Sequence, residues 1–330
     1  MTTQIRRAVV TGTGSCLPEK IMTNSDFEKI VDTTDEWITT RTGIKERHIA
    51  EPDTACSDLA AGASKRAIAN AGLKPEDIDL ILVATVTPDH FFPSTACRVQ
   101  AKIGAFNAGA VDLSAACSGF VYAVGLANGY IACGAADRIL VIGSEILTKF
   151  VDYTDRTTCI LFGDGAGAAV LEAASDGRGV QYSLMGADGR GGDMMIIPAG
   201  GSAMPPSEQT VADRNHYIIV RGREVFKFAV NRMQWLIQDA ADKCGIKPED
   251  IDIVIPHQVN IRILKSAADK FGFPMDKIFV NIDRVGNTSG ASVPIALAEA
   301  NEKGLIKQGD LVLLIGFGGG LTWSSAVIRW

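Results

Sequence analysis

One ten-residue phrase occurs twice in this chain, once in each half. The phrase GLKPEDIDLI begins at Gly72 and returns as GIKPEDIDIV at Gly245, and each copy leads from an Ala-rich amphipathic stretch into an apolar run. The distance between the copies far exceeds the roughly 20–50 residues of a solenoid or propeller repeat. We therefore expect a duplicated half-domain, with residues 1–175 as the first half and residues 176–330 as the second. Because the strand ends that follow the two phrases have diverged, we expect their loops to surround one shared cleft.

The composition is that of a globular protein. Of the 330 residues, 47% are hydrophobic and 21% are charged, which is ordinary for a folded domain. The formal net charge of −6 gives no reason to expect nucleic acid as a partner. We expect neither a signal peptide nor a membrane-spanning helix, which needs about 20 apolar residues in a row. The seven cysteines include no Cys-x-x-Cys pair, so we expect reduced thiols in a cytoplasmic protein, without disulfides or a zinc site.

Short β-branched runs alternate with helical patterns along the whole chain, which predicts an α/β protein with largely parallel sheets. The predicted strands are Ala8–Thr11, Leu80–Thr85, Gly109–Leu113, Arg138–Gly143, Ala168–Glu172, Ile251–Ile255, Ile278–Asn281, Leu311–Ile315 and Ser325–Arg329. The predicted helices include Cys56–Ala71, Ser118–Cys133, Val225–Cys244 and Ile261–Phe271. The Gly- and Met-rich segment Ser175–Pro206 lacks periodicity, and we expect it to join the halves with loops or hairpins that cover something.

Two segments are expected to form helices that are buried on all sides. Residues 118–127 carry no charge on any face, and a helix that is apolar all round must be buried. The segment Ser292–Ala300 holds the matching place in the second half, because Ser289-Gly290 corresponds to Ser118-Gly119. Two buried helices between two sheets predict a layered α-β-α-β-α sandwich.

Cys117 differs from the other cysteines in its setting. It follows the predicted strand Gly109–Leu113 and begins the first buried helix. A thiol at a helix N-terminus has its thiolate stabilised by free backbone N–H groups and the helix dipole, which favours a nucleophile near neutral pH. The alternative is a buried structural cysteine, the usual place of a free thiol. The remaining cysteines lack this setting and are expected to be packing residues; they are Cys16, Cys56, Cys97, Cys133, Cys159 and Cys244.

Polar groups in the second half could face this thiol. His257 ends an apolar strand, where parallel sheets place active-site groups, although a structural histidine is the alternative; the other three histidines are expected to be solvated. Asn287 lies in a Gly-Asn-Thr-Ser phrase at the entry to the second buried helix, where it either caps the helix or donates to a substrate carbonyl. The glycine-rich run from Gly316 to Gly320 allows backbone N–H groups to turn toward a small anion.

Together these residues resemble β-ketoacyl-acyl carrier protein synthase III, a family of the thiolase superfamily. The resemblance runs essentially end to end and implies a thiolase-like duplicated α-β-α-β-α sandwich. The matching phrases are DTTDEWI from Asp32, RTGI from Arg41, AACSGF from Ala115, DR at Asp155, FGDGAG from Phe162, PHQVN from Pro256, GNTS from Gly286 and FGGG from Phe317.

The resemblance implies the initiating condensing enzyme of type II fatty acid synthesis. Cys117 would take an acyl group, acetyl by default, from acyl-CoA. His257 and Asn287 would bind the carbonyl of malonyl-acyl carrier protein and stabilise the enolate that forms on decarboxylation. The N–H groups of Cys117 and Gly319 would form the oxyanion hole. The product is a β-ketoacyl-acyl carrier protein, and coenzyme A enters as substrate with no metal or redox cofactor.

The resemblance also implies binding surfaces and a homodimer. Trp37 and Arg156 would sandwich the adenine of coenzyme A, and Phe92 would close the acyl pocket of the neighbouring subunit. The other residues expected along the coenzyme A channel are Thr33, Arg41, Gly222 and Asn260. The other residues expected at the acyl pocket are Leu161, Phe162 and Leu321. The residues expected to dock the acidic carrier protein are Gln258, Arg262, Lys227, Lys265 and Lys270, for which a solvated helical face is the alternative.

Two departures from the family pattern leave the primer open. Leu321 stands where a Phe is more familiar, and Gly290 stands where an Ala is more familiar, so longer, branched or specialised primers compete with acetyl. By the same resemblance, Asn287 separates the chain from elongating synthases, which have a Cys-His-His set. Thiolases use a second, C-terminal cysteine, and none follows Cys244, which argues against thiolase activity. The alternatives are a starter-unit or specialised polyketide-type condensing enzyme and, in another class, a non-catalytic partner subunit.

Overall fold

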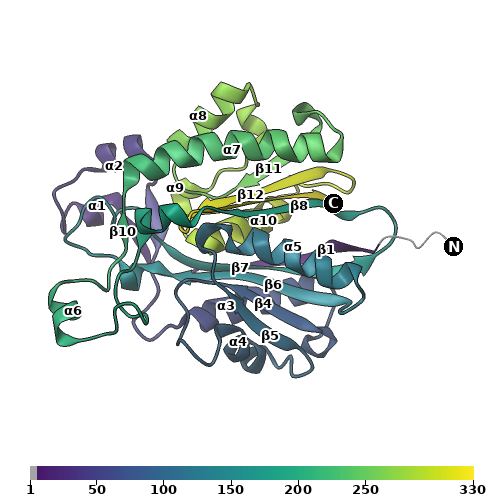
Figure 1. The fold of residues 1–330 in the computed structure, drawn as a ribbon, viewed down its shortest axis with the longest axis horizontal. Coiled ribbons are helices and arrows are strands. Elements are labelled where there is room, and N and C mark those ends of the chain that lie inside the picture. Colours follow the sequence, from purple (N-terminus) through teal and green to yellow (C-terminus); the bar gives the residue numbers. More distant parts are fainter. Residues whose placement is uncertain (1–5) are drawn as a thin grey trace.

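Two mixed sheets stack with helices between them and outside them in the computed structural model, which describes residues 6–330 except for the side chains of residues 270 and 271. Figure 1 shows the layers from α7 and α8 at the top, through the two sheets with α5 and α10 between them, to α3 and α4 at the bottom. The predicted α-β-α-β-α sandwich is therefore confirmed.

The first sheet has the strand order β1-β7-β6-β4-β5. Its strands are β1 (Arg7–Cys16), β4 (Leu80–Ala84), β5 (Gly109–Leu113), β6 (Arg138–Ile146) and β7 (Asp164–Ala174). Strand β4 runs parallel to β5 and β6, whereas β7 is antiparallel to β6 and β1. Strands β6 and β7 are buried almost throughout, because helices cover both faces of the sheet, and they therefore have continuous apolar sequences.

The second sheet repeats this order and these directions. Its order is β11-β12-β13-β8, with the strands β8 (Gly179–Ala187), β11 (Ile253–Pro256), β12 (Leu311–Gly318) and β13 (Thr322–Arg329). Strand β11 is parallel to β12, and β13 is antiparallel to β12 and β8. Thus β8, β11, β12 and β13 correspond to β1, β4, β6 and β7.

The structure differs from the predicted strands in two places. The predicted strand Ile278–Asn281 is wrong, since only Ile278 forms an isolated parallel bridge, to Val254 at the place of β5. The segment Ser175–Pro206, expected to hold loops or hairpins, contains the nine-residue strand β8, which no strand prediction included. That strand is half-buried over much of its length and lies at the edge of the sheet, so its sequence lacks the apolar run of a central strand. Because β7 ends at Ala174 and β8 begins at Gly179, we propose that the halves meet near residue 175.

The helices fill the remaining layers. Between the sheets lie α5 (Gly119–Ala132) and α10 (Ser292–Glu302); outside the first sheet lie α3 (Cys56–Asn70) and α4 (Thr95–Ile103); outside the second lie α7 (Gly222–Cys244) and α8 (Ile261–Phe271). Glycines in the first sheet let α10 approach closely. A Cβ atom on Gly167 would lie 2.4 Å from the carbonyl carbon of Pro294, a distance at which the helix would have to move away.

Short elements gather at one end of the layers (Figure 1). They are β2 (Ile21–Thr23), α1 (Asn24–Phe27), α2 (Asp35–Thr42), β3 (Glu46–His48), β9 (Met195–Ile196), α6 (Glu208–Ala212), β10 (Ile219–Val220) and α9 (Ile282–Val285). Several of them share a small hydrophobic cluster around Phe27, Ile38 and Phe162. None of the helices formed within residues 6–330 is long and apolar enough to cross a membrane.

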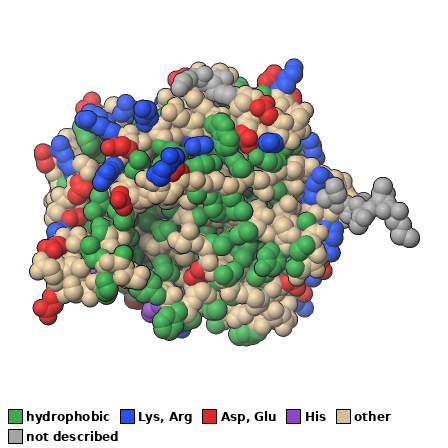
Figure 2. All heavy atoms as spheres, viewed as in Figure 1, with side chains coloured by type: hydrophobic (Ala, Val, Ile, Leu, Met, Phe, Trp, Pro, Cys, Tyr) green, Lys and Arg blue, Asp and Glu red, His purple; other side chains and the backbone are tan. Residues whose placement is uncertain are grey.

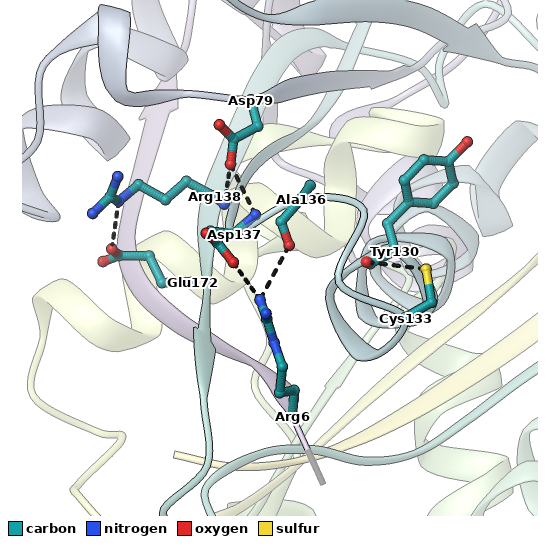
Figure 3. A network of polar contacts seen from close by, with 8 residues as sticks. All are labelled: Arg6, Asp79, Tyr130, Cys133, Ala136, Asp137, Arg138 and Glu172. Atoms are coloured by element: carbon teal, nitrogen blue, oxygen red, sulfur yellow. Dashed lines mark hydrogen bonds and ion pairs between the residues drawn. The ribbon is translucent and has the colours of Figure 1, made fainter. Parts of the chain in front are cut away.

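A polar network fixes the amino end of β6 (Figure 3). Asp79 accepts hydrogen bonds from the backbone N–H groups of Asp137 and Arg138, both at 2.8 Å. The Arg138 side chain pairs with Glu172 on β7 at 3.1 Å, and Arg6 pairs with Asp137. These contacts tie β1, β4, β6 and β7 together at the end where β6 begins.

Candidate active site

Cys117 lies on a short 3₁₀ turn (Ala116–Ser118) between β5 and α5, which we call the nucleophile turn. Ala116 has a φ of 46°, in the left-handed region that non-glycine residues adopt only where surrounding structure enforces it. Part of that support comes from the second half of the chain. The Thr322 hydroxyl lies 3.1 Å from the Ala115 carbonyl oxygen and 3.1 Å from the Ser118 hydroxyl.

The glycines of β12 allow the second half to press against the nucleophile turn. A Cβ atom on Gly318 would lie 2.8 Å from Cβ and 3.0 Å from Sγ of Cys117, and one on Gly316 would lie 3.0 Å from the Cys117 carbonyl oxygen. No side chain fits at either position. Gly319 lines the cavity beside Cys117, while the donation of its N–H group to an oxyanion stays a prediction.

The turn from Asn287 to Ser292, which enters α10, contacts the other two candidate residues. The Ser289 hydroxyl lies 3.5 Å from Cys117 Sγ, and the Ser292 hydroxyl lies 2.6 Å from Nδ1 of His257. Asn287 belongs to the same turn and accepts the Ser289 N–H group on Oδ1 at 2.9 Å. The structure thus joins Cys117, His257 and Asn287, which are far apart in sequence, through one six-residue segment.

His257 is held rigidly at the end of β11. Its backbone N–H donates to Ile315 at 2.8 Å, and its ring packs edge-on against Phe317 with 5.7 Å between ring centres. The side chain is 1% exposed, and this burial lowers the pKa of His257 to about 3. The imidazole is therefore neutral at physiological pH.

Cys117 is also neutral at rest. Its side chain is buried, and burial raises the pKa of the Cys117 thiol to about 12, with the negative charge of Glu145 acting in the same direction. The predicted stabilisation of a thiolate by the start of α5 is therefore outweighed, because removal from water disfavours the charged form more strongly. The resting site holds a thiol and a neutral imidazole.

The backbone and the amide oxygen of Asn287 are both engaged. Its N–H donates to the Leu161 carbonyl at 2.9 Å, and its carbonyl accepts from the Gly163 N–H at 3.0 Å. Because Oδ1 accepts from Ser289, the group that this side chain can offer to a ligand is its Nδ2 amide, a donor.

A largely apolar cavity of about 360 Å³ adjoins Cys117. Phe162 lines it as predicted, but Leu161 and Leu321 do not. Leu321 is buried, and a Cβ atom on Gly191 would lie 2.6 Å from its side chain; Leu161 packs in the cluster behind Phe162. The apolar lining that sequence reasoning missed consists of Val86, Leu147, Met195, Ile196, Ile197 and Ile218. The expectation that Ser175–Pro206 covers something was the one signal that pointed to part of this set.

Phe92 does not line this cavity. Its side chain is 86% exposed, and that of the neighbouring Phe91 is 82% exposed. The expected role of Phe92 in a neighbouring subunit stays a prediction.

Most of the residues expected to bind coenzyme A lie on α2 or beside it. The guanidinium carbons of Arg41 and Arg156 lie 5.6 Å and 5.5 Å from the ring centre of Trp37. Asn260 caps α8 and donates from Nδ2 to the Arg41 carbonyl at 2.9 Å. The Thr33 hydroxyl is buried with no hydrogen-bond partner among residues 6–330. Gly222, the first residue of α7, is exposed, with open space where a side chain would extend.

Three of the five residues expected to dock a carrier protein lie on the surface. Arg262, Lys227 and Lys265 are exposed, and the Arg262 guanidinium lies 5.9 Å from the Phe226 ring centre, so α7 and α8 contribute to one surface. The side chain of Lys270 lies outside the described part of the structure.

The docking role predicted for Gln258 is wrong. Gln258 is fully buried; its amide nitrogen donates to the carbonyls of Pro256 and Phe279, both at 3.0 Å, and its amide oxygen accepts from the Asn281 N–H. A side chain used in this way by three backbone groups cannot contact a protein partner.

The remaining cysteines are all free thiols, but two are not packing residues. Cys97 and Cys133 are exposed, whereas Cys56 and Cys159 are buried. The described residues contain no group of three or more His, Cys, Asp or Glu side chains arranged to hold a metal ion.

Comparison with known proteins agrees with this geometry. The family model of 3-oxoacyl-[acyl-carrier-protein] synthase III matches residues 111–189, and that of its C-terminal region matches residues 241–330. A beta-ketoacyl-[acyl-carrier-protein] synthase III from Caldanaerobacter subterraneus subsp. tengcongensis is 56% identical over 323 residues, 98% of each chain.

Solved structures show the same likeness over the whole chain. The 3-oxoacyl-[acyl-carrier-protein] synthase III from Aquifex aeolicus VF5 is similar with a TM-score of 0.91 and 47% identity, over 98% of this chain and 100% of that one. The priming β-ketosynthase of the R1128 polyketide pathway is similar with a TM-score of 0.90 and 34% identity, over 99% and 97%. This chain therefore has the thiolase-like fold and belongs to the β-ketoacyl-[acyl-carrier-protein] synthase III family of acyltransferases.

Proposed function

We propose that this chain initiates fatty acid synthesis by transferring an acyl group from acyl-CoA to Cys117 and condensing it with malonyl-acyl carrier protein. The observation that carries the proposal is the single turn that contains Asn287 and contacts both Cys117 and His257. It combines a protected thiol with two neutral hydrogen-bond donors, which is what acyl transfer followed by decarboxylation requires.

In the first half-reaction, Cys117 Sγ forms a bond to the thioester carbonyl carbon and the bond to the sulfur of coenzyme A breaks. The thiol proton is transferred, in sum, to the departing coenzyme A. The raised pKa of Cys117 keeps the nucleophile protonated until substrate is bound. The N–H groups of Cys117 and Gly319 are the donors for the oxyanion, whose charge develops only in the transition state.

In the second half-reaction, the bond between the malonyl carboxylate and its methylene carbon breaks, CO₂ leaves, and the electron pair becomes a thioester enolate. His257 and Asn287 donate to the enolate oxygen. Its carbon then attacks the acyl carbonyl on Cys117, and the bond from that carbonyl carbon to Sγ breaks. The cysteine leaves as a thiolate and takes up a proton from solvent. Because burial lowers the pKa of His257 to about 3, the imidazole acts as a neutral donor through Nε2–H, with Nδ1 facing the Ser292 hydroxyl.

The coenzyme A moiety lies beside α2 in this proposal. Trp37 and Arg156 sandwich the adenine, and Arg41 lies beside them along the channel. The Arg156 guanidinium now lies 5.5 Å from the Trp37 ring centre and donates to the Asp32 carbonyl at 2.6 Å. It must therefore move away from the ring to admit the adenine between them. Thr33 supplies a buried hydroxyl that needs a partner.

A homodimer is part of the proposal. Figure 2 shows hydrophobic side chains gathered on the face over α5 and the first sheet. Phe92, Phe106 and Val111 are exposed by 86%, 73% and 46%. Val111 lies on β5, which is an edge strand paired only with β4 within the described chain. An apolar edge is covered most simply by the same edge of a second copy, and this would bring Phe92 toward the neighbouring active site.

A starter-unit condensing enzyme of a specialised pathway is the second candidate. The likeness to the priming β-ketosynthase of the R1128 polyketide pathway favours it, and so does the apolar cavity beside Cys117, whose lining lies partly outside the family phrases.

Incubation with a panel of acyl-CoA primers, followed by mass spectrometry of the intact protein and its peptides, tests the function. We expect one acyl adduct on Cys117, none in Cys117→Ala, and a β-ketoacyl product after addition of malonyl-acyl carrier protein. An adduct with an aromatic, branched or long primer but not with acetyl would favour the second candidate. The absence of an adduct with every primer would support a non-catalytic partner subunit.

A further inference from the structure

A buried carboxylate lies beneath the candidate active site without a cation. Glu145 is the penultimate residue of β6 and is 0% exposed, and no salt bridge within residues 6–330 includes it. Its carboxylate instead accepts from the Thr87 hydroxyl at 2.7 Å, the Val86 N–H at 3.1 Å, the Thr85 hydroxyl at 3.2 Å and the Gly290 N–H at 3.4 Å.

These donors come from both halves of the chain. Thr85, Val86 and Thr87 follow β4 in the first half. Gly290 lies in the second half, in the turn that contacts Cys117 through Ser289. Glu145 is therefore the carboxylate at which the strand end of one half and the helix entry of the other meet.

The lack of a side chain at position 290 makes this contact possible. A Cβ atom there would lie 3.2 Å from Oε1 of Glu145 and 3.2 Å from the Ala116 carbonyl oxygen, closer than such contacts are normally made. Gly290 thus lets the carboxylate approach the turn and lets the turn approach the residue before Cys117. In this chain, the close approach of Glu145 and the nucleophile turn therefore favours a glycine at position 290.

We propose that Glu145 is a positioning residue that holds the Ser289–Gly290 backbone against the nucleophile turn. The same contacts place its negative charge beside that turn, where it opposes the formation of a second negative charge on Cys117. This inference rests on the proposed role of Cys117 as nucleophile. The described titratable groups that interact with Glu145 are Cys117 on the nucleophile turn and Cys56 on α3, and its charge raises the pKa of both thiols. The segment that follows β4 and the turn before α10 contribute only hydroxyl and N–H groups to it. Burial in turn raises the pKa of Glu145 to about 7.

The geometric part of the proposal is tested with Gly290→Ala, Glu145→Asp and the double variant. The added methyl group of Gly290→Ala meets the carboxylate, and we expect acylation of Cys117 to slow about tenfold, the equivalent of about 1.4 kcal/mol. Glu145→Asp withdraws the carboxylate and makes room. We therefore expect the double variant to be faster than Gly290→Ala alone. Two rate losses that simply multiply would show independent sites and would overturn the bridging role.

The electrostatic part is tested by the rate at which iodoacetamide alkylates Cys117, followed by peptide mass spectrometry. In Glu145→Gln the charge is absent, so Cys117 should be alkylated several-fold faster at pH 8, since a fall of one pKa unit gives about ten times more thiolate. Glu172→Gln is the matched control, because Glu172 pairs with Arg138 at the opposite end of β6 (Figure 3), and its alkylation rate should equal that of the wild type.

An unchanged alkylation rate in Glu145→Gln would overturn the electrostatic role. If that variant does not fold, the same comparison is made with Glu145→Ala, which also removes the charge and should also be alkylated several-fold faster; Glu145→Asp keeps the charge and should stay near the wild-type rate. Alkylation reports on the thiol without any substrate, so its result is independent of the acyl-CoA panel, and failure of the proposed function would be seen separately.

Discussion

The two helix entrances at the centre of the molecule have the same backbone and different chemistry. In the first half, Ala116 has a φ of 46° and leads into α5; in the second half, Ser289 has a φ of 47° and leads into α10. The first entrance carries the thiol, and the second carries an amide and two hydroxyls that contact the other groups of the site. A duplicated half-domain places two such entrances face to face, so one copy can keep a nucleophile while the other keeps hydrogen-bond donors.

Burial drives the thiol of the first entrance and the imidazole at the end of β11 to their neutral forms. It raises the pKa of Cys117 and lowers that of His257, so each group is driven to its neutral form. The resting pair is therefore thiol and imidazole rather than thiolate and imidazolium. If Cys117 is the nucleophile, as proposed above, it stays protonated until a substrate binds.

The largest effect is expected from removing the reactive atom of the first entrance. Cys117→Ala should abolish both acylation and condensation, because no other buried thiol adjoins the cavity among the described residues. The fold should persist, since the change deletes one sulfur atom, and circular dichroism checks this. Condensation retained in this variant would show that the two entrances do not divide the work as proposed.

Removing donors from the second half should separate the half-reactions. His257→Ala and Asn287→Ala should each slow decarboxylation of malonyl-acyl carrier protein about 100- to 1000-fold, the usual cost of losing one donor to a developing oxyanion. Acylation of Cys117 should change far less. The two rates are measured as release of CO₂ and as the intact mass of the acyl-enzyme. Equal losses in both would indicate structural damage or a role in activating the thiol.

The sequence predicts much of the fold. The repeated phrase predicts two halves, and the charge-free segment at 118–127 predicts the central helix layer. Strand β8 was missed because it is a half-exposed edge strand with a mixed sequence. Ile278–Asn281 was overpredicted because an apolar run shows burial but not whether its backbone pairs with a neighbour.

The site was only partly predictable from sequence. Cys117 and His257 were singled out by their places at a helix start and a strand end, and the resemblance supplied their roles. The contacts of Ser292 and Glu145 join segments far apart in the chain, so no local pattern indicates them. The thiol pKa was predicted in the wrong direction because a helix start is visible in sequence whereas the depth of burial is not.

A smaller effect is expected from the hydroxyl that orients the imidazole. Ser292 lies 2.6 Å from Nδ1 of His257 and accepts the Gln258 N–H at 3.3 Å, so its own proton is directed to the ring and Nε2 keeps its hydrogen. Ser292→Ala should slow decarboxylation about tenfold, at the low end of what orienting partners contribute in other sites, with acylation nearly unchanged. Ser292→Thr keeps the hydroxyl and should recover most of the rate, whereas a structural role alone would give no such recovery.

The smallest expected effect concerns the basic surface formed by α7 and α8. Arg262 and Lys265 are exposed on α8, and Lys227 is exposed on α7, so this basic surface can attract an acidic carrier protein although the whole chain carries a net charge of −6. Arg262→Glu should raise KM for malonyl-acyl carrier protein a few-fold at low salt, and the defect should shrink as salt screens the wild-type attraction. KM for acyl-CoA should change less, because Trp37 and Arg41 are proposed to hold it independently.

Lys307→Glu is the matched control, since Lys307 is exposed in the same half before β12 begins, at the end of that strand away from Gly318. If Arg262→Glu and Lys307→Glu give the same KM at low salt, the carrier protein docks elsewhere. The second half would then supply hydrogen-bond donors to the site but not the surface on which the carrier protein docks.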